Sequence, residues 1–184
     1  MLLQTFPRIA GDAEEACWRL YTEAFDRLRT AAAQRHVMLR GEFEDVLRDE
    51  RVTKYVAVDP AHDRRICGLA TVTNDLCAVP LVSPDFFAHR WPALYARRRI
   101  WYVGFVAIHP DYQRGTLFAE IIADIGRMVA AAGGVAAMDV CRRTDEQLHL
   151  PRAVGRFLEF LVPGTRGVRL DEQTYWAYEF PATS

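Results

Sequence analysis

The 184-residue sequence contains a single lysine, Lys54, and its formal net charge is −1. The other basic residues, apart from five histidines, are arginines. A protein that binds nucleic acid mainly through phosphates needs a basic surface. The charge therefore argues against nucleic acid as the main partner.

Long apolar runs are also absent. No segment approaches the roughly 18 uncharged apolar residues that a membrane span needs. Residues 1–16 lack the basic and apolar regions of a secretory signal. We therefore expect a cytoplasmic protein with no membrane partner.

The sequence has few metal-ligating or disulfide-forming patterns. The four cysteines include no C-x-x-C pair, which favours reduced, partly buried thiols. The histidines show no ligand spacing either, so no metal site is expected. The residues concerned are Cys17, Cys67, Cys77 and Cys141, and His36, His62, His89 and His109.

The hydrophobic and charged fractions, 51% and 26%, are those of an ordinary globular chain, and the length suits one domain over residues 1–184. Apolar periodicity predicts helices over residues 12–29, 41–49, 116–131 and 146–161. Strands are predicted over residues 54–58, 66–73, 100–108, 135–141, 168–170 and 174–180, the first two as an antiparallel hairpin. This order predicts an α/β protein with a mixed sheet and helices on both faces.

Residues 75–99 interrupt this pattern as an insert rich in proline and aromatic residues. Ser83-Pro84 and Trp91-Pro92 are each typical of the start of a short helix, with proline at the first helical position. We expect the insert to form either a packed lid or the wall of a pocket.

The segment at residues 105–122 carries the strongest functional signal. An apolar strand ends in His109-Pro110-Asp111-Tyr112, a polar corner follows at residues 113–116, and an apolar helix begins at once. Unpaired N–H groups at a helix N-terminus and in such a turn form a cradle for negative charge. The pattern favours an anion-binding turn over a plain corner.

Over residues 106–141 the sequence resembles the GNAT acetyltransferase superfamily, and in element order the resemblance extends over roughly residues 12–180. It implies a GNAT-like fold with a mixed, mostly antiparallel sheet. It also implies that acetyl-CoA or another acyl-CoA is the co-substrate. It places the pantetheine arm against the backbone of Val106 and Ile108, where the strand parts from its neighbour at a β-bulge. Gly104 suits the bulge, and Gly134 suits a close backbone approach. The pyrophosphate would contact Gln113, Arg114, Gly115, Thr116, Leu117 and Phe118.

The segment departs from the family's phosphate motif, Q/R-x-x-G-x-G/A, at the positions that require small residues. Thr116 and Phe118 stand at its two small-residue positions, or, with a one-residue gap, Gly115 and Leu117 do. A phosphate needs room more than it needs glycine. If the Phe118 ring points into the core, the cradle survives; if it points outward, the ring blocks the site.

Acyl transfer to an amine needs a base for the ammonium proton and an acid for the leaving thiolate. The resemblance puts Tyr102 where some members have a glutamate, and Phe157 where many have a catalytic tyrosine. Neutral phenol is a poor base near neutral pH. Further candidates are His149, at the start of a helix, and Cys141, at the end of a strand beside the opening, with Asp139 two residues earlier.

The resemblance and these residues predict an N-acyltransferase that moves an acetyl or other acyl group to a small-molecule amine by direct attack. The resemblance implies that the insert at residues 75–99 lies near the acceptor side of the active site. It also allows a homodimer, an assembly common in the family that no feature of this sequence shows. Two alternatives stay open. The chain could be a GNAT-like protein that binds CoA or another ligand without catalysis, because Phe118 and Phe157 replace expected residues. It could instead use longer acyl groups from acyl-CoA or an acyl carrier protein, because the insert offers an apolar wall.

Overall fold

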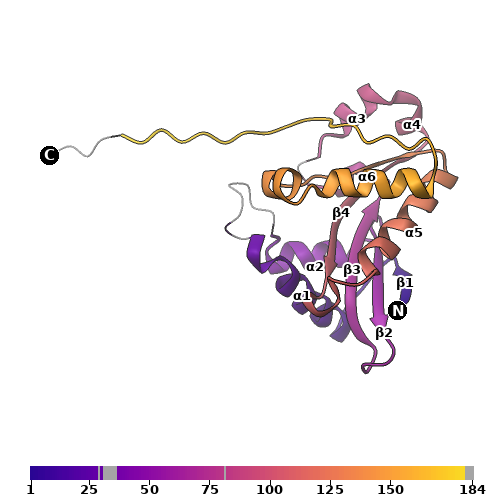
Figure 1. Ribbon diagram of the computed structural model, residues 1–184, viewed down its shortest axis with the longest axis vertical. Coiled ribbons are helices and arrows are strands. Elements are labelled where there is room, and N and C mark those ends of the chain that lie inside the picture. Colours follow the sequence, from indigo (N-terminus) through magenta and orange to yellow (C-terminus); the bar gives the residue numbers. More distant parts are fainter. Residues whose placement is uncertain (29, 31–36, 81, 181–184) are drawn as a thin grey trace.

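The computed structural model describes residues 1–28, 30, 37–80 and 82–180. Within them a five-stranded sheet has the order β1-β2-β3-β4-β5, with neighbours antiparallel except for the parallel pair β4 and β5 (Figure 1). The strands are β1 (Leu2–Phe6), β2 (Thr53–Asp59), β3 (Arg65–Thr73), β4 (Ile100–Ile108) and β5 (Val135–Ala137). The predicted α/β class and the mixed, mostly antiparallel sheet are confirmed.

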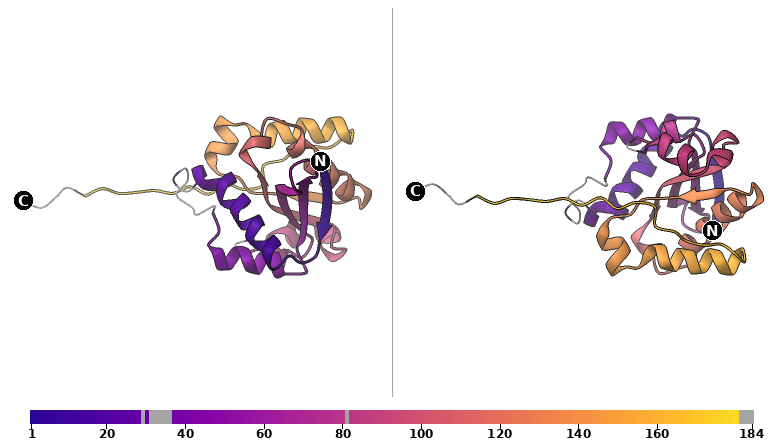
Figure 2. Two further views of the ribbon diagram at one scale, coloured as in Figure 1. Left: turned by 90° about the horizontal axis from the view of Figure 1, so that it is seen from below. Right: turned by 90° about the horizontal axis from the view of Figure 1, so that it is seen from above.

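Helices cover both faces of this sheet (Figure 2). The helices α1 (Asp12–Phe25) and α2 (Arg40–Arg48) pack on one face, and α5 (Leu117–Ala131) packs on the other, where α6 (Leu150–Leu161) contacts it. Because side chains alternate along a strand, Val56 joins the α1 side of the core and Tyr55 the α5 side. None of the described helices is long and apolar enough to cross a membrane.

The insert forms two short helices, as its prolines predict. They are α3 (Pro84–Arg90) and α4 (Pro92–Ala96), each with proline in the first turn. The Ser83 hydroxyl caps α3 by accepting the N–H of Phe86 at 3.3 Å. Phe87 packs with Ile100 and Tyr102 in a third core cluster. The insert therefore covers the end of the sheet at which β4 begins.

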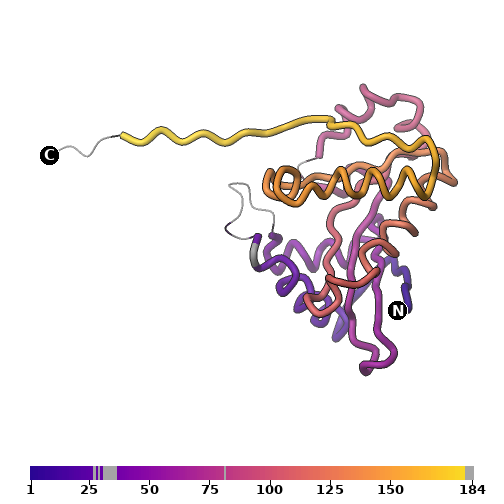
Figure 3. The backbone as a smooth tube through the Cα atoms, viewed as in Figure 1, coloured from indigo at the N-terminus to yellow at the C-terminus, as the bar shows by residue number. Residues whose placement is uncertain are grey.

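Both ends of the chain differ from the prediction. Residues 2–6 form a strand that their short apolar run did not indicate, while residues 168–170 and 174–180 form no strand. From residue 171 the chain runs away from the body as an extended segment (Figure 3). The alternation in residues 174–180 is typical of a strand, but a strand needs a neighbouring strand to pair with.

Three predicted elements are shorter than expected. The first helix ends at Phe25, a 3₁₀ turn follows over Asp26–Leu28, and residue 29 lies outside the described residues. The strand predicted over residues 135–141 ends at Ala137, and the helix predicted from residue 146 begins at Leu150. A π-helical turn over Arg143–Gln147 precedes that helix. The helix begins at Leu150 because Pro151 has to lie within its first turn.

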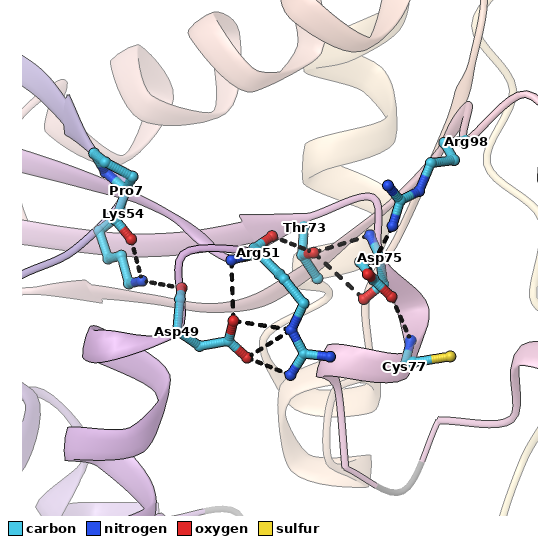
Figure 4. A network of polar contacts seen from close by, with 8 residues as sticks. All are labelled: Pro7, Asp49, Arg51, Lys54, Thr73, Asp75, Cys77 and Arg98. Carbon is cyan, nitrogen blue, oxygen red and sulfur yellow. Dashed lines mark hydrogen bonds and ion pairs between the residues drawn. The ribbon is translucent and has the colours of Figure 1, made fainter.

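The only lysine is a buried structural residue (Figure 4). The Lys54 ammonium donates to the carbonyl oxygens of Pro7 at 2.8 Å and Asp49 at 2.6 Å. Asp49 caps the end of α2, and its carboxylate pairs with Arg51. Lys54 therefore joins the ends of β1 and α2 to β2. Burial lowers the pKa of Lys54 to about 8, against the raising effect of nearby carboxylates.

This burial predicts a pH-dependent stability. Lys54 is charged in both states below about pH 8 and neutral in both above its ordinary pKa of 10.5. Between these values the unfolded chain binds more protons, so stability rises with pH. We expect the free energy of unfolding, relative to Lys54→Met, to increase by about 3 kcal/mol across this range. Urea unfolding at several pH values measures it, and a difference that does not change with pH would contradict a buried ammonium.

The same polar network fastens the insert to the sheet (Figure 4). The carboxylate of Asp75 accepts Arg98 Nη2 at 2.6 Å and the N–H of Cys77 at 3.2 Å. The Thr73 hydroxyl, at the end of β3, donates to the carbonyl oxygen of Arg51 at 2.7 Å. These contacts fix both ends of the insert, at residues 75 and 98, beside the start of β4.

Candidate functional site

The sheet opens between β4 and β5. The two strands pair only where Ile100–Tyr102 of β4 meets Val135–Ala137 of β5. A β-bulge follows at Gly104, because Thr71 pairs with Phe105 while Val72 pairs with Val103. A Cβ at Gly104 would lie 2.7 Å from the Thr71 hydroxyl oxygen, which accounts for glycine at the bulge. Beyond the bulge, β4 has no strand on its β5 side within the described residues.

The backbone direction of β4 decides which residues face this opening. The N–H of His109 donates to Cys67 of β3 at 2.9 Å, so its neighbour Ile108 faces the other way. Alternation places the backbone of Val106 on the same side as that of Ile108. The carbonyl oxygen of Ile108 accepts Gln113 Nε2 at 3.2 Å. Val106 therefore presents its N–H and C=O towards the opening.

The turn after β4 is held by polar contacts. The Tyr112 hydroxyl donates to Asp59 Oδ2 at 2.8 Å, and His109 Nδ1 accepts the N–H of Asp111 at 3.2 Å. Hydrogen bonds from Tyr112 and then His62 lower the pKa of Asp59 to about 2. The Asp59 carboxylate therefore stays charged at neutral pH and anchors the turn to the end of β2.

This turn leads into the N-terminus of α5. The first intrahelical bond runs from the N–H of Glu120 to the carbonyl oxygen of Thr116 at 2.9 Å. Helix geometry therefore leaves the N–H groups of residues 116–119 without an intrahelical acceptor, at the positive end of the helix dipole. A Cβ at Gly115 would approach only the Tyr112 carbonyl oxygen, at 3.4 Å, so the backbone there is accessible. The exposed Arg114 adds positive charge.

The direction of the Phe118 ring decides whether an anion can reach the N-terminus of α5. Leu117 is buried in the core cluster beneath α5, and Phe118 is half-buried and packs against that same cluster. This packing favours the alternative in which the ring leaves the cradle open. A group that the sequence reasoning missed opposes an anion there: the Glu120 carboxylate, which accepts the Thr116 hydroxyl.

A tyrosine–carboxylate pair lies at the apex of the opening, where the pairing of β4 with β5 ends at Tyr102 and Ala137. The buried Tyr102 hydroxyl donates to Asp139 Oδ1 at 2.6 Å. Burial, and then the Asp139 carboxylate, raise the pKa of Tyr102 above its ordinary range. Tyr102 therefore stays protonated as a hydrogen-bond donor and does not act as a base. Asp139 lies two residues beyond β5, at an exposed position, and its carboxylate is the acceptor in this hydrogen bond.

The other two predicted catalytic residues are placed differently. Cys141 is buried beyond the end of β5, and its sulfur lies 3.2 Å from the Thr144 hydroxyl. His149 is exposed at the N-cap of α6 in a left-handed conformation with φ 50°. Among the described residues, no hydrogen bond joins Cys141 or His149 to Tyr102. The structure brings Tyr102 together with Asp139 instead.

The remaining predictions about sites concern metals, thiols and the insert. All four cysteines are free, with only Cys77 exposed. The described residues include no cluster that could hold a metal ion, and His36 lies outside them. A cavity of about 370 Å³ lies between the insert and β4, near Asp75 and Arg98. Because neither Tyr102 nor Asp139 lines it, the cavity is separate from the apex of the opening.

Neither a protein-family model nor a curated protein sequence matches this chain. Solved structures with the same fold do. One is the aminoglycoside acetyltransferase AAC(6')-Iy with the bisubstrate analog CoA-S-monomethyl-acetylneamine, 11% identical, TM-score 0.53, covering 97% of this chain and 99% of that one. Another is a mutant of the Bacillus halodurans protein BH1408, 15% identical, TM-score 0.56, covering 98% and 100%. The Escherichia coli ribosomal-protein-S18-alanine N-acetyltransferase is 12% identical, TM-score 0.52, covering 84% and 77%. With its opening between β4 and β5 and the helix that follows β4, the chain has the fold of the GNAT acetyltransferases.

Proposed function

We propose that the protein is an N-acyltransferase that moves an acetyl or other acyl group from acyl-CoA to a small amine. The observation that carries this proposal is the opening between β4 and β5, which continues past the Gly104 bulge to the N-terminus of α5. An extended thioester arm fits along an unpaired strand side, and a pyrophosphate fits the N–H groups of a helix end. A neighbour of the same fold, AAC(6')-Iy, has been solved with CoA and with a bisubstrate analog that contains CoA, which supports a CoA thioester as donor.

The chain's own groups suit an acyl-CoA in two places. The Val106 backbone offers a donor and an acceptor to the amide groups of the arm. The N–H groups of residues 116–119 and the side chain of Arg114 offer donors to the pyrophosphate, next to Gln113, which donates to the carbonyl oxygen of Ile108. The N–H of Gly115 already donates to the Tyr112 carbonyl oxygen at 3.1 Å. Glu120 opposes the fit, because its carboxylate stands in the first turn of α5. The bound thioester supplies the acyl group, and these residues orient it.

The Tyr102–Asp139 pair would bind and deprotonate the acceptor amine. An amine arrives as an ammonium ion and must lose a proton before it attacks a carbonyl. The Asp139 carboxylate would attract the ammonium and take up that proton, while the Tyr102 hydroxyl fixes the carboxylate's orientation. Attack by the neutral amine then forms the C–N bond and breaks the C–S bond of the thioester, with much of the rate coming from positioning. The second proton of the amine passes to the leaving CoA thiolate, which departs as the thiol. The buried thiol of Cys141 is not required as a nucleophile.

Calorimetric titration tests donor binding. We expect CoA and acetyl-CoA to bind wild type at micromolar concentration, because Phe118 packs against the core. Phe118→Gly should bind no more than a few-fold more tightly. Glu120→Gln should bind roughly 3- to 10-fold more tightly, because it removes a negative charge from the helix N-terminus. A series of longer acyl-CoAs identifies the preferred chain length.

The same titrations separate the alternatives. If only Phe118→Gly binds, the ring blocks the cradle and the acyl-CoA proposal is wrong. If wild type binds CoA but acylates no member of a broad amine panel, the protein is a non-catalytic binder. Phe157, half-buried where many members have the catalytic tyrosine, is the observation that favours this second function. A preference for hexanoyl and longer chains would identify a longer-chain acyltransferase.

A further inference from the structure

The cavity between the insert and β4 has the size of a small-molecule site. Its volume is about 370 Å³, and such sites commonly measure about 300–1,000 Å³. It has no part in the proposed acyl transfer, because neither Tyr102 nor Asp139 lines it. Its apolar lining comes from Leu76 and Ile100, and its polar lining includes Asn74, Asp75, Tyr95 and Arg98.

Arg98, one of the lining residues, has a backbone conformation that is unfavourable for an arginine. Its φ is 51°, in the left-handed region that favours glycine. The N–H of Arg98 donates to the Tyr95 carbonyl oxygen at 2.9 Å, and the N–H of Arg99 donates to that of Leu94 at 2.8 Å. These two bonds form a Schellman motif at the end of α4, where glycine is the usual residue at the position of Arg98. The end of the helix therefore does not explain why this residue is an arginine.

The ion pair that Arg98 forms does not explain it either. Arg98 Nη2 donates to Asp75 at 2.6 Å (Figure 4), but the Arg98 side chain is 64% exposed, and exposed ion pairs contribute little to stability. The backbone of Arg98 is held independently, because Asn74 Nδ2 donates to its carbonyl oxygen at 3.0 Å. Unfavourable backbone conformations are concentrated at sites that bind ligands. We therefore attribute the arginine to a ligand of the cavity.

The polar groups that remain for such a ligand are mainly hydrogen-bond donors. The Asp75 carboxylate already accepts Arg98 and the N–H of Cys77, so a cationic ligand would have to displace Arg98. A guanidinium has five N–H donors, and the contact with Asp75 leaves most of them for another acceptor. The Tyr95 hydroxyl forms no hydrogen bond with another described residue. A carboxylate suits these donors best, since its two oxygens match the planar guanidinium.

We propose that this cavity binds a small carboxylate with an apolar body, at a site separate from the opening between β4 and β5. The Arg98 guanidinium bridges the Asp75 carboxylate and the carboxylate of the ligand. The Tyr95 hydroxyl donates a further hydrogen bond, and Leu76 and Ile100 contact the apolar body. The inference is independent of the acyl-transfer proposal, because the two sites share no residue.

Titration with 4-phenylbutanoate, followed by NMR, tests the site, and 4-phenylbutanamide is the uncharged counterpart. We expect the carboxylate to bind with a dissociation constant of about 1 mM or lower, as a probe of this size can. The amide should bind about 10-fold more weakly, because it cannot form charge-assisted hydrogen bonds. The largest shifts should be those of the backbone amides of Asn74, Cys77 and Ile100. No binding, equal binding of the two probes, or largest shifts at Tyr102 and Asp139 would overturn the proposal.

Arg98→Gly separates a ligand contact from a structural role. Glycine suits the φ of 51°, so the melting temperature should stay unchanged or rise, while the affinity for 4-phenylbutanoate should fall about 10-fold or more. Arg97→Gly is the matched control, because Arg97 has a φ of −96° and does not line the cavity, and it should keep the affinity within a few-fold. Wild-type affinity in Arg98→Gly, or an equal loss in Arg97→Gly, contradicts the proposal.

The affinity for CoA keeps this inference apart from the acyl-transfer proposal. Arg98→Gly should bind CoA as tightly as wild type, because Arg98 lies before β4 and the groups that suit the pyrophosphate follow it. A wild type that binds 4-phenylbutanoate at Asn74 and Ile100 but binds no CoA supports the cavity and removes acyl transfer. A wild type that binds CoA but not 4-phenylbutanoate removes the cavity site alone.

Discussion

Replacing Asp139 with asparagine should lower kcat/KM for amine acylation about 100-fold, because general acid–base groups contribute factors of 100 or more. The substitution keeps the shape of the side chain and its acceptor oxygen for the Tyr102 hydroxyl, which lies 2.6 Å away in the wild type. It removes the negative charge that attracts the ammonium and accepts its proton. Steady-state kinetics with the best amine of the panel measure the loss.

The affinity for CoA supplies the control for this prediction. Asp139 lies at the apex of the opening, whereas the N–H groups that suit the pyrophosphate begin at residue 116. The CoA dissociation constant of Asp139→Asn should therefore stay within a few-fold of wild type. Tyr102→Phe should cause a smaller loss, about 10-fold, since a hydrogen bond to a charged group contributes about 1.5–3 kcal/mol. An unchanged kcat/KM in Asp139→Asn would rule out the carboxylate as the base.

The parts of the fold that the sequence predicts well are those with local signals. The helix at Leu117–Ala131 has a full apolar face, a polar corner before it and Gly133 with φ 61° after it. The prolines of the insert mark the first turns of α3 and α4. Gly104 is the bulge where the strand parts from its neighbour, as predicted. In each case one or two residues impose the backbone geometry.

The parts that the sequence does not predict depend on pairing partners. Residues 2–6 become β1 only because the outer side of β2 is open to them, over the register Leu2–Val58 to Phe6–Lys54. Residues 174–180 have a strand pattern but form no strand. Alternating side chains show that a segment suits a sheet edge, and they do not show which edge it meets or whether that edge lies in the same copy.

In the candidate site, too, the features formed by consecutive residues could be predicted, and the contacts between distant residues could not. The strand, the turn and the helix start could be predicted because they form one continuous segment. The Tyr102–Asp139 contact joins residues 37 apart in sequence, and Asp139 was expected within a strand that in fact ends at Ala137. The ring direction of Phe118 depends on which core residues lie beneath α5, and a motif alignment does not contain that information.

The geometry of the opening depends most on Gly134, the residue before β5. A Cβ at this position would lie 2.5 Å from the Arg99 carbonyl oxygen and 2.4 Å from a ring carbon of Trp101. The φ of Gly134 is not left-handed, so alanine could adopt the backbone conformation and the obstacle is space alone. The Arg99 carbonyl oxygen lies just before β4 and accepts the N–H of Val135 at 3.0 Å, so it can give way only by moving the start of β5.

We therefore expect Gly134→Ala to lower the free energy of unfolding by about 3 kcal/mol, as overpacking against backbone does. Gly155→Ala is the matched control: Gly155 lies within α6, nothing stands within 4 Å of its added Cβ, and alanine there should stabilise the protein by up to about 1 kcal/mol. Urea unfolding followed by circular dichroism measures both changes. If the two substitutions have equal effects, β4 and β5 are not packed as closely as the structure places them. If Gly134→Ala alone is destabilising and also weakens CoA binding, the close approach at residue 134 sets the opening that acyl-CoA requires.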